Sequence, residues 1–152
     1  MAKTLNVEFI TPDRTVFEGE ATEVILPVEG GGSIGVLAGH APLGATLEVG
    51  IARVDKADGE QVFMIVGDGF IEVRDNEVKV LAELGERDDE IDLARAEEAE
   101  RRNRERLKDR VAQEVDFDRA KASLTRAMTR IKILRDLAPG KARRKPRDPR
   151  GG

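Results

Sequence analysis

Glycine and proline are missing from one long stretch of this chain. All fifteen glycines and all six prolines lie at or before Gly85, or at or after Pro139. Both residues favour turns and are unfavourable inside helices. The 53 residues from Glu86 to Ala138 are therefore predicted to be helical with one interruption. The residues before them are predicted to form short elements joined by many turns.

The charges are distributed unevenly between these two parts. Residues 1–86 hold 6 Lys and Arg against 16 Asp and Glu, a net charge of −10, whereas residues 87–152 hold 20 against 14, a net charge of +6. The acidic first part argues against nucleic acid as a partner of the folded domain. The absence of cysteine excludes disulfides and thiolate metal sites, and we expect no metal site. No run approaches the roughly 20 apolar residues of a membrane span, and the N-terminus lacks a signal-peptide pattern, so a cytosolic location is the default expectation.

The first part has the pattern of antiparallel β-structure. Apolar residues alternate with polar ones over 5–9 and again over 47–51, as in half-buried strands. Asp58-Gly59 and Asp75-Asn76 predict hairpin turns, and Gly67-Asp68-Gly69 predicts a tight turn. Many short strands with no helical pattern between them predict a sandwich or a flattened barrel.

Two features of this part resemble catalytic or phosphate-binding signals. Gly30-Gly31-Gly32 lacks the Lys-Ser/Thr ending of a phosphate-binding loop and precedes no helical pattern, so a loop between strands is the favoured interpretation. His40 is the only histidine, and its neighbours Gly39, Ala41 and Pro42 supply no acid or nucleophile. A structural or interface role for His40 is therefore favoured over catalysis.

The glycine- and proline-free stretch predicts an antiparallel helical hairpin. The first helix is expected over about 89–113, and a break in the pattern follows at 114–118, where Asp116 could cap a second helix. Apolar residues then recur at spacings of three and four until Pro139: Phe117, Ala120, Leu124, Ala127, Ile131, Leu134 and Ala138. Many of these are alanines, so the hairpin buries little apolar surface for its length. We therefore expect a movable arm with more than one docked state.

Arginines on the two predicted helices suggest an anion site. Asp92 and Arg95 are neighbours at i,i+3, and Arg126 and Arg130 share a face at i,i+4. An antiparallel pairing could bring Arg95 near the other two arginines, where they would suit a polyphosphate or an acidic protein surface. The alternative is that all three are solvated surface arginines.

Taken together, these residues resemble the epsilon subunit of F-type ATP synthase, which is called delta in mitochondria. The resemblance covers about residues 3–138. The following segments carry it: Thr11-Pro12, Val16-Phe17-Glu18-Gly19 and Ala21, Ile34-Gly35-Val36-Leu37, His40-Ala41-Pro42-Leu43, Gly69-Phe70-Ile71-Glu72-Val73, Asn76, Val78-Lys79-Val80-Leu81-Ala82 and Ile91-Asp92.

The resemblance implies an α+β fold, with a ten-stranded antiparallel β-sandwich over 1–86 and an antiparallel α-helical hairpin over 87–138. A basic tail over 139–152, expected to be disordered, has no counterpart in the family. The implied function is that of a non-catalytic central-stalk subunit that couples proton flow to ATP synthesis. Its hairpin would inhibit ATP hydrolysis when extended. The implied location is the cytoplasmic face of the bacterial inner membrane, with the chloroplast thylakoid as the less favoured choice.

The resemblance also implies partners and contact residues. The gamma subunit and the c-ring would bind the sandwich, and the extended hairpin would reach the catalytic alpha/beta hexamer. The c-ring would face Gly31, Gly32 and Ser33, the stalk would lie near His40, Ala41, Pro42 and Leu43, and the beta subunit would meet Arg126, Arg130, Lys132 and Arg135.

A regulatory nucleotide is a further implication of the resemblance, although no cofactor is required. Some bacterial members bind ATP on the folded hairpin through a motif of the form Ile-Asp-x-x-Arg-Ala. The matching residues of this chain are Ile91, Asp92, Arg95 and Ala96, supported by Glu86, Arg126 and Arg130.

A second function class remains open from the residues alone. The chain could be a free-standing adaptor whose basic arm clamps a polyanion. Five phenylalanines with no tyrosine or tryptophan disfavour single-strand nucleic-acid binding, which relies on aromatic stacking. An independent enzyme finds no support beyond the lone His40.

Overall fold

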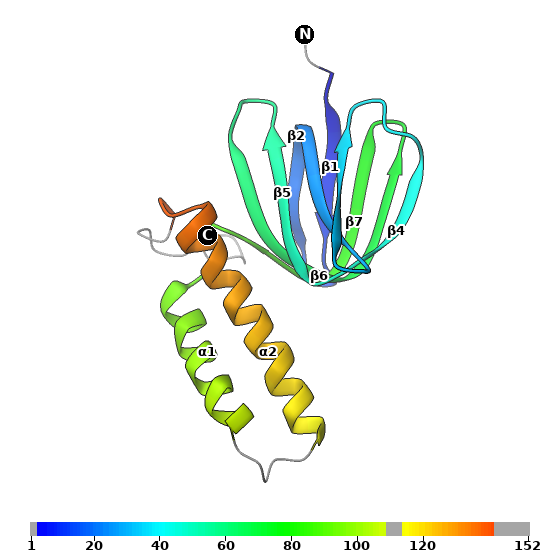
Figure 1. The fold of residues 1–152 in the computed structure, drawn as a ribbon. Helices are drawn as coiled ribbons and strands as arrows, with labels where there is room; N and C mark the ends of the chain where they lie inside the picture. The colour runs from blue at the N-terminus through cyan, green and yellow to red at the C-terminus, as the bar shows by residue number, and fades with distance from the viewer. Residues whose placement is uncertain (1–2, 109–113, 142–152) are drawn as a thin grey trace. The chain divides into compact units, whose positions relative to one another are not determined.

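The computed structural model divides the chain into two compact units, Met1–Arg87 and Asp88–Gly152 (Figure 1). It describes residues 3–108 and 114–141. The predicted first helix extends into 109–113, and most of the predicted basic tail is 142–152, so both of these segments lie outside the described residues.

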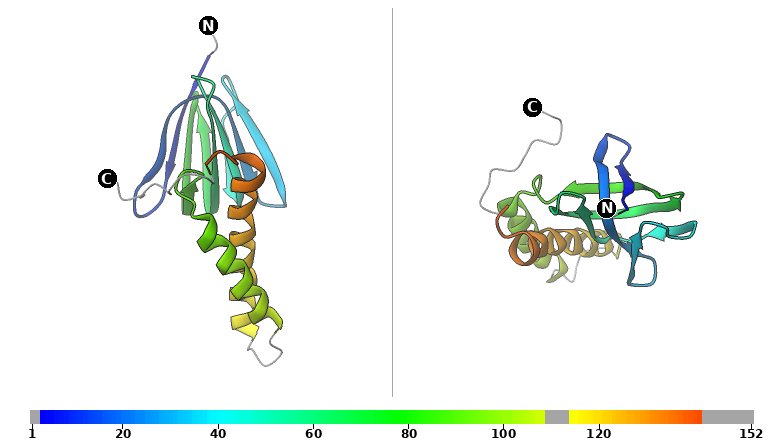
Figure 2. Two further views of the ribbon diagram at one scale, coloured as in Figure 1. Left: turned by 90° about the vertical axis from the view of Figure 1, so that its left-hand side faces the viewer. Right: turned by 90° about the horizontal axis from the view of Figure 1, so that it is seen from above.

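The first unit is built from β-strands. The described residues of this unit form β1 Leu5–Ile10, β2 Thr15–Val28, β3 Gly32–Leu37, β4 Leu43–Leu47, β5 Gly50–Lys56, β6 Gln61–Arg74 and β7 Glu77–Arg87. The pairings β1–β2, β2–β5, β5–β6, β6–β7 and β7–β1 form a closed circuit, with β4 between β2 and β6 and with β3 on the outer side of β2 (Figures 1 and 2). Only the β1–β7 pairing among these is parallel. The predicted antiparallel β-sandwich is confirmed, with this one parallel pair as an exception.

Two long strands explain why the strand count differs from the family expectation. The resemblance implied ten strands, but the described residues form seven. The first half of β2 pairs with β1, and its second half pairs with β3 and β5. In the same way β6 pairs with β5 up to Val66 and with β4 from Gly69 onward. Each long strand therefore takes the place of two shorter ones.

Alternation along most of the strands places the core inside the circuit, although β6 also buries the consecutive residues Met64, Ile65 and Val66. The fully buried side chains include Leu5, Val7, Phe9, Val24, Leu26, Ile71, Val73, Val78 and Val80. They occupy alternate positions, because successive side chains of a strand point to opposite faces of the sheet. Each such burial stabilises the fold by about 1.5–3 kcal/mol. The ring of Phe9 also meets that of Phe17 edge-on, with the centroids 6.3 Å apart.

Both predicted hairpin turns are present. Asp75 and Asn76 have φ of 51° and 61°, and they join β6 to β7 as a two-residue turn. Between β5 and β6, the backbone N–H of Glu60 donates to the Asp58 carboxylate at 2.9 Å and lowers the pKa of that carboxyl group. The Lys56 ammonium donates to the Glu60 carboxylate at 3.3 Å, and this contact is the main reason why the pKa of Lys56 is raised.

The predicted tight turn at Gly67-Asp68-Gly69 is wrong. The segment lies inside β6, and the neighbouring strand β7 continues beside it, with Gly67 opposite Leu84 and Gly69 opposite Ala82. Asp68 has a φ of 55° and is left out of the pairing, so the segment is a kink in a continuous strand. A Cβ at Gly69 would lie 1.8 Å from the carbonyl oxygen of Leu81, so the strands approach too closely for any side chain there. The glycines allow the strand to bend where the sequence alone suggests a reversal.

The alternation over 47–51 does not correspond to one strand. β4 ends at Leu47, Glu48 and Val49 form a bend, and β5 begins at Gly50. Three apolar residues at a spacing of two are too few to distinguish one strand from the junction of two.

The second unit is a helical hairpin, as predicted. It contains the α-helices α1 Leu93–Lys108 and α2 Glu114–Lys132, which pack against each other, and the π-helical turn η1 Ile133–Leu137 (Figures 1 and 2). Helix α1 begins at Leu93 and not at Asp89, because the Asp92 carboxylate accepts a hydrogen bond from the Arg95 N–H at 3.2 Å and caps the helix. Asp116 is not a cap, since α2 already begins at Glu114. It lies in the first turn of α2, where its negative charge suits the helix dipole.

The predicted apolar face of the second helix is buried at four of its seven residues. Ala120, Ala127, Ile131 and Leu134 are buried, Leu124 and Ala138 are half-buried, and 43% of Phe117 is exposed. The buried residues of α1 are Ala96 and Asn103, and the Asn103 amide donates to the Ala99 carbonyl of its own helix at 2.8 Å. None of the helices in the described ranges is long and apolar enough to cross a membrane.

The contact at Gly69 generates a stability prediction. We expect Gly69→Ala to lower the free energy of unfolding by about 3 kcal/mol, because the clash is with backbone and no rotamer change relieves it. The matched control is Gly32→Ala, whose Cβ would meet nothing within 4 Å and which should change stability by less than about 0.5 kcal/mol. Urea unfolding of both variants measures the difference, and equal stabilities would refute the close approach.

Candidate functional site

The two predicted contact segments of the sandwich lie at opposite ends of one strand. Gly31 belongs to the turn that precedes β3, Gly32 and Ser33 begin this strand, and the three residues are exposed. The Gly31 N–H donates to the Glu48 carboxylate at 3.0 Å, which fixes this turn beside the end of β4. The segment His40–Leu43 follows the other end of β3, about 20 Å away at about 3.3 Å per residue. A single partner surface of small size would not cover both segments.

His40 is oriented by backbone atoms. Its ring Nδ1 lies 2.6 Å from the Ala41 carbonyl oxygen, and its backbone N–H donates to the Leu37 carbonyl at 3.1 Å. Next to it, the Gly39 N–H donates to the Asn76 side-chain oxygen at 2.7 Å, so the turn between β6 and β7 supports the loop. The contacts of His40 and its neighbours thus fit the structural or interface role. Ala41 and Pro42 are exposed beside it, and Leu43 is half-buried.

The sequence reasoning missed an apolar groove on the outer face of the sandwich. Phe70 and Leu81 are cross-strand partners and are each 49% exposed. Together with Ile10 and Ala82 they line a groove of about 400 Å³, which Asp68 and Glu83 border with acidic side chains. The available signal was the strand phase. Since Ile71, Val73, Val78 and Val80 face the core, Phe70 and Leu81 must face outward, where large apolar residues indicate a contact surface.

The start of α1 contains the four residues of the possible nucleotide motif. Ile91 and Ala96 are buried, so their side chains serve packing. Asp92 caps the helix through the Arg95 N–H, and Arg95 itself is exposed. The motif therefore combines two packing residues and one cap with a single cation that a ligand could reach.

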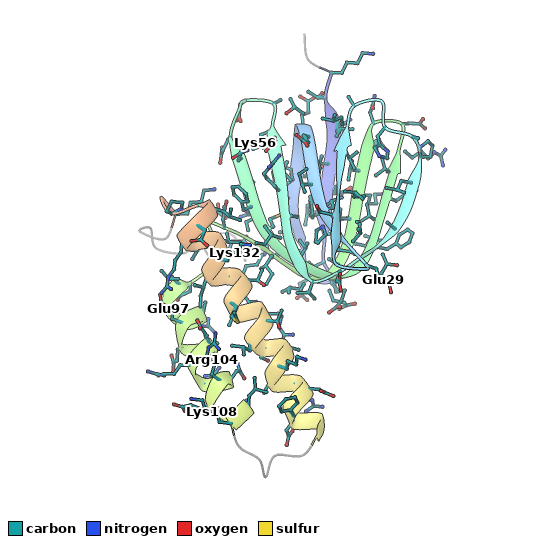
Figure 3. All side chains as sticks on the ribbon, in the orientation of Figure 1. Glu29, Lys56, Glu97, Arg104, Lys108 and Lys132 are labelled. Atoms are coloured by element: carbon teal, nitrogen blue, oxygen red, sulfur yellow. The ribbon has the colours of Figure 1, made fainter. Side chains whose placement is uncertain are left out.

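Two contacts between the helices define the register of the hairpin. The Arg104 guanidinium reaches the Met128 sulfur at 3.7 Å, and the Arg135 guanidinium bonds the Glu97 carboxylate at 2.7 Å. Arg104 is seven residues after Glu97, and Met128 is seven residues before Arg135, so the contacts agree on one register. Figure 3 shows Glu97 and Arg104 on α1 and Lys132 on α2.

This register separates the three arginines along the hairpin axis. Arg95 lies level with Leu137, seven residues beyond Arg130 and eleven beyond Arg126. At about 1.5 Å per residue, the axial separations are about 10 Å and about 16 Å. The three arginines are therefore spread along the hairpin axis, where an elongated anion could lie along them.

The four basic residues predicted for the beta subunit do not share one face of α2. Lys132 and Arg135 line a groove of about 570 Å³ together with Thr125, Met128, Thr129, Ile131, Asp136 and Glu100. At 100° per residue, Arg126 and Arg130 lie on the opposite flank of the buried stripe. The Arg126 guanidinium donates to the Ser123 hydroxyl at 3.1 Å, and both arginines are half-buried.

Glu86 belongs to the other unit. It lies near the end of β7, opposite Ile65 of β6, and is half-buried. Its carboxylate is therefore carried by the sandwich, while the remaining residues of the possible nucleotide site are carried by the hairpin. The described residues contain no group of three or more His, Asp or Glu that could hold a metal ion.

Comparison with known proteins now assigns the family. The model of the ATP synthase delta/epsilon chain β-sandwich domain matches residues 4–88, and that of the long α-helix domain matches residues 89–135. The chain belongs to the delta/epsilon chain family of ATP synthase. The two family models meet within one residue of the boundary between the two compact units.

Curated relatives agree over nearly their whole length. The ATP synthase epsilon chain of Macrococcus caseolyticus is 38% identical over 132 residues, which cover 86% of this chain and 96% of that protein. The epsilon chain of Symbiobacterium thermophilum is 43% identical over 129 residues, which cover 84% of this chain and 91% of that protein. The expected family and the role of a subunit that is not itself catalytic are thereby confirmed.

A solved structure shares the fold. A chain in the structure of the Euglena gracilis mitochondrial ATP synthase, comprising OSCP, F1 and the c-ring, superposes with a TM-score of 0.62 at 20% identity. The match covers 90% of this chain and 81% of that chain.

Proposed function

We propose that this family member is a central-stalk subunit of a proton-translocating ATP synthase, and that its two units have separate tasks. The sandwich binds the gamma subunit and the c-ring, and the hairpin regulates ATP hydrolysis. The observation that carries the proposal is the division of the chain at residues 87 and 88, which coincides with the boundary of two family domains. We place the subunit on the cytoplasmic face of the bacterial inner membrane, held there by its partners, since the two curated relatives described above are bacterial.

The surface of the sandwich supports binding to more than one partner. The exposed segment at Gly31–Ser33 and the segment at His40–Leu43 lie at opposite ends of β3, so one can face the c-ring while the other faces the stalk. The groove at Phe70 and Leu81 offers apolar area of the kind that anchors protein interfaces. We assign this groove to the gamma subunit.

The energetics of the hairpin support a movable regulatory arm. Its buried residues combine four large side chains, Ile91, Ile131, Ile133 and Leu134, with Ala96, Ala120 and Ala127, which contribute little apolar area, and with the polar Asn103. The ion pair that joins the helices, Arg135 with Glu97, is exposed, and such pairs contribute about 0.2–1 kcal/mol. Separating α1 from α2 therefore requires less free energy than opening the sandwich, whose apolar core is larger. In the extended state, cationic side chains on both flanks of α2 are available to an acidic surface of the beta subunit.

Regulatory ATP would lie along the hairpin. The axial separation of Arg95 from Arg130 and Arg126 suits an extended nucleoside triphosphate better than a compact anion. The exposed Arg95 stands in the first turn of α1, where the helix dipole also favours negative charge. ATP bound there would stabilise the closed hairpin and so disfavour inhibition.

The groove assignment predicts the effect of a polar substitution. We expect Phe70→Ser to weaken binding of the gamma subunit about tenfold, because it removes an exposed apolar anchor while the core stays intact. Surface plasmon resonance with purified gamma subunit measures this. Glu20→Ser, an exposed strand residue that does not line the groove, is the control. Equal affinities would remove the groove from the interface, and a chain that binds no gamma subunit but binds polyanions would instead support a free-standing adaptor.

A second prediction concerns the rate of ATP hydrolysis by the complex when the hairpin is removed. Deletion of residues 88–152 should leave binding to the gamma subunit intact and raise the rate of ATP hydrolysis, since the inhibitory arm is lost. A coupled ATPase assay of the reconstituted complex measures the rate. An unchanged rate would show that the hairpin does not inhibit this enzyme.

Calorimetry of the full chain tests whether ATP binds to the hairpin. We expect ATP to bind at up to millimolar concentration and Arg126→Ala to weaken it about tenfold or more, since a charge-assisted hydrogen bond contributes about 1.5–3 kcal/mol. Arg119→Ala, an exposed arginine of α2 outside the proposed site, is the matched control. No heat of binding, or equal affinity for both variants, would exclude the proposed site.

A further inference from the structure

A buried ion pair joins the two ends of the hairpin. The Lys141 ammonium lies 2.7 Å from the Asp88 carboxylate, and the two residues are 53 positions apart in the sequence. The Asp88 side chain is 1% exposed and the Lys141 side chain 23%. A carboxylate that is removed from water needs positive charge and hydrogen bonds close to it. The contact is therefore much less screened by salt than the exposed pair of Arg135 with Glu97.

The end of the helical region directs Lys141 to this place. In η1, the Ala138 N–H donates to the Ile133 carbonyl at 2.7 Å, which closes a π-helical turn. Ile133 and Leu134 are fully buried and anchor that turn. The Lys141 N–H then donates to the Ala138 carbonyl at 3.0 Å, so the chain reverses through Pro139 and Gly140. The reversal brings the lysine back beside the start of the hairpin.

We propose that Asp88 and Lys141 form a latch that holds the start of α1 close to the end of η1, and so keeps the hairpin closed. Asp88 precedes the Asp92 cap of α1 by four residues, and Lys141 follows the last residue of η1 by four. Helix α1 ends at Lys108 and α2 begins at Glu114, both at the opposite end of the hairpin from Asp88 and Lys141. The latch therefore joins the end at which the two helices do not follow each other directly in the sequence. Any movement that parts the helices at this end must break the pair.

One partner of the latch, Lys141, lies outside the residues that the family models match. The helix-domain model ends at residue 135, and Lys141 comes after it. Lys141 is also the first cation of the basic segment 141–150. We infer that this C-terminal extension contributes a closing contact to the hairpin. The latch would act on the hairpin whether or not the hairpin inhibits ATP hydrolysis.

Hydrogen exchange on the full-length chain tests the latch. We expect Lys141→Met, which keeps most of the aliphatic stem but loses the charge, to speed exchange of the Arg95 and Ala138 amides about tenfold. Core amides of the sandwich, such as that of Ile71, should not change. Lys121→Met is the control, because Lys121 is an exposed lysine of α2 far from this end of the helix. Lys141→Arg should restore slow exchange.

A double-mutant cycle with Asp88→Asn gives a second readout. If the residues act as a pair, the exchange rates of Asp88→Asn with Lys141→Met together should rise by less than the product of the two single effects. Equal exchange in Lys141→Met and Lys121→Met, or multiplicative effects in the cycle, would overturn the proposal.

Discussion

The sandwich depends on the pairing of β6 with its three neighbours. This strand pairs with β5 in its first half, with β4 in its second half and with β7 along most of its length. One strand can serve both halves only because it kinks at Asp68, where Gly67 and Gly69 let the neighbouring backbone come close. Because of this kink, β6 can pair with β5 on one side of the core and with β4 on the other, and the strands close around one core. The exposed segments at the ends of β3 and the groove at Phe70 are positioned by that circuit.

The two units differ in how they are held together. The first unit buries large aliphatic side chains at alternate positions of most strands. The buried residues of α1 and α2 are three alanines, the polar Asn103 and one large side chain, Ile131. Burial of apolar area is the main favourable term in folding, so the sandwich is the stable part and the hairpin the more easily rearranged part. This difference suits a subunit that must stay attached through one unit while the other changes state. The Asp88–Lys141 pair adds a closing contact to the hairpin, and this contact does not depend on burying more apolar surface.

Much of the fold could be read from the residues because it depends on local patterns. The alternation over Leu5–Phe9, the hairpin turn at Asp75-Asn76 and the helical stripe that includes Ala127 and Ile131 each follow from backbone geometry within a few residues. The errors arose where a local signal had two meanings. Gly67-Asp68-Gly69 can make a turn or a kink, and only the neighbouring strand β7 decides between them. For the candidate site, residue types identified cations and a capping acid, but the register that separates Arg95 from Arg130 depends on contacts between helices.

The sequence by itself determined that an acidic β-rich part precedes a helical arm, because glycine and proline interrupt helices and their absence from 86–138 permits them. It also identified the family, since the motifs occur in the right order. Only the tertiary structure decided that Phe70 and Leu81 lie side by side in one groove, and which charges meet, such as Asp88 with Lys141. The physical reason is range: turn and helix preferences act over a few residues. Burial and ion pairing depend on segments that are far apart in the chain and that only folding brings together.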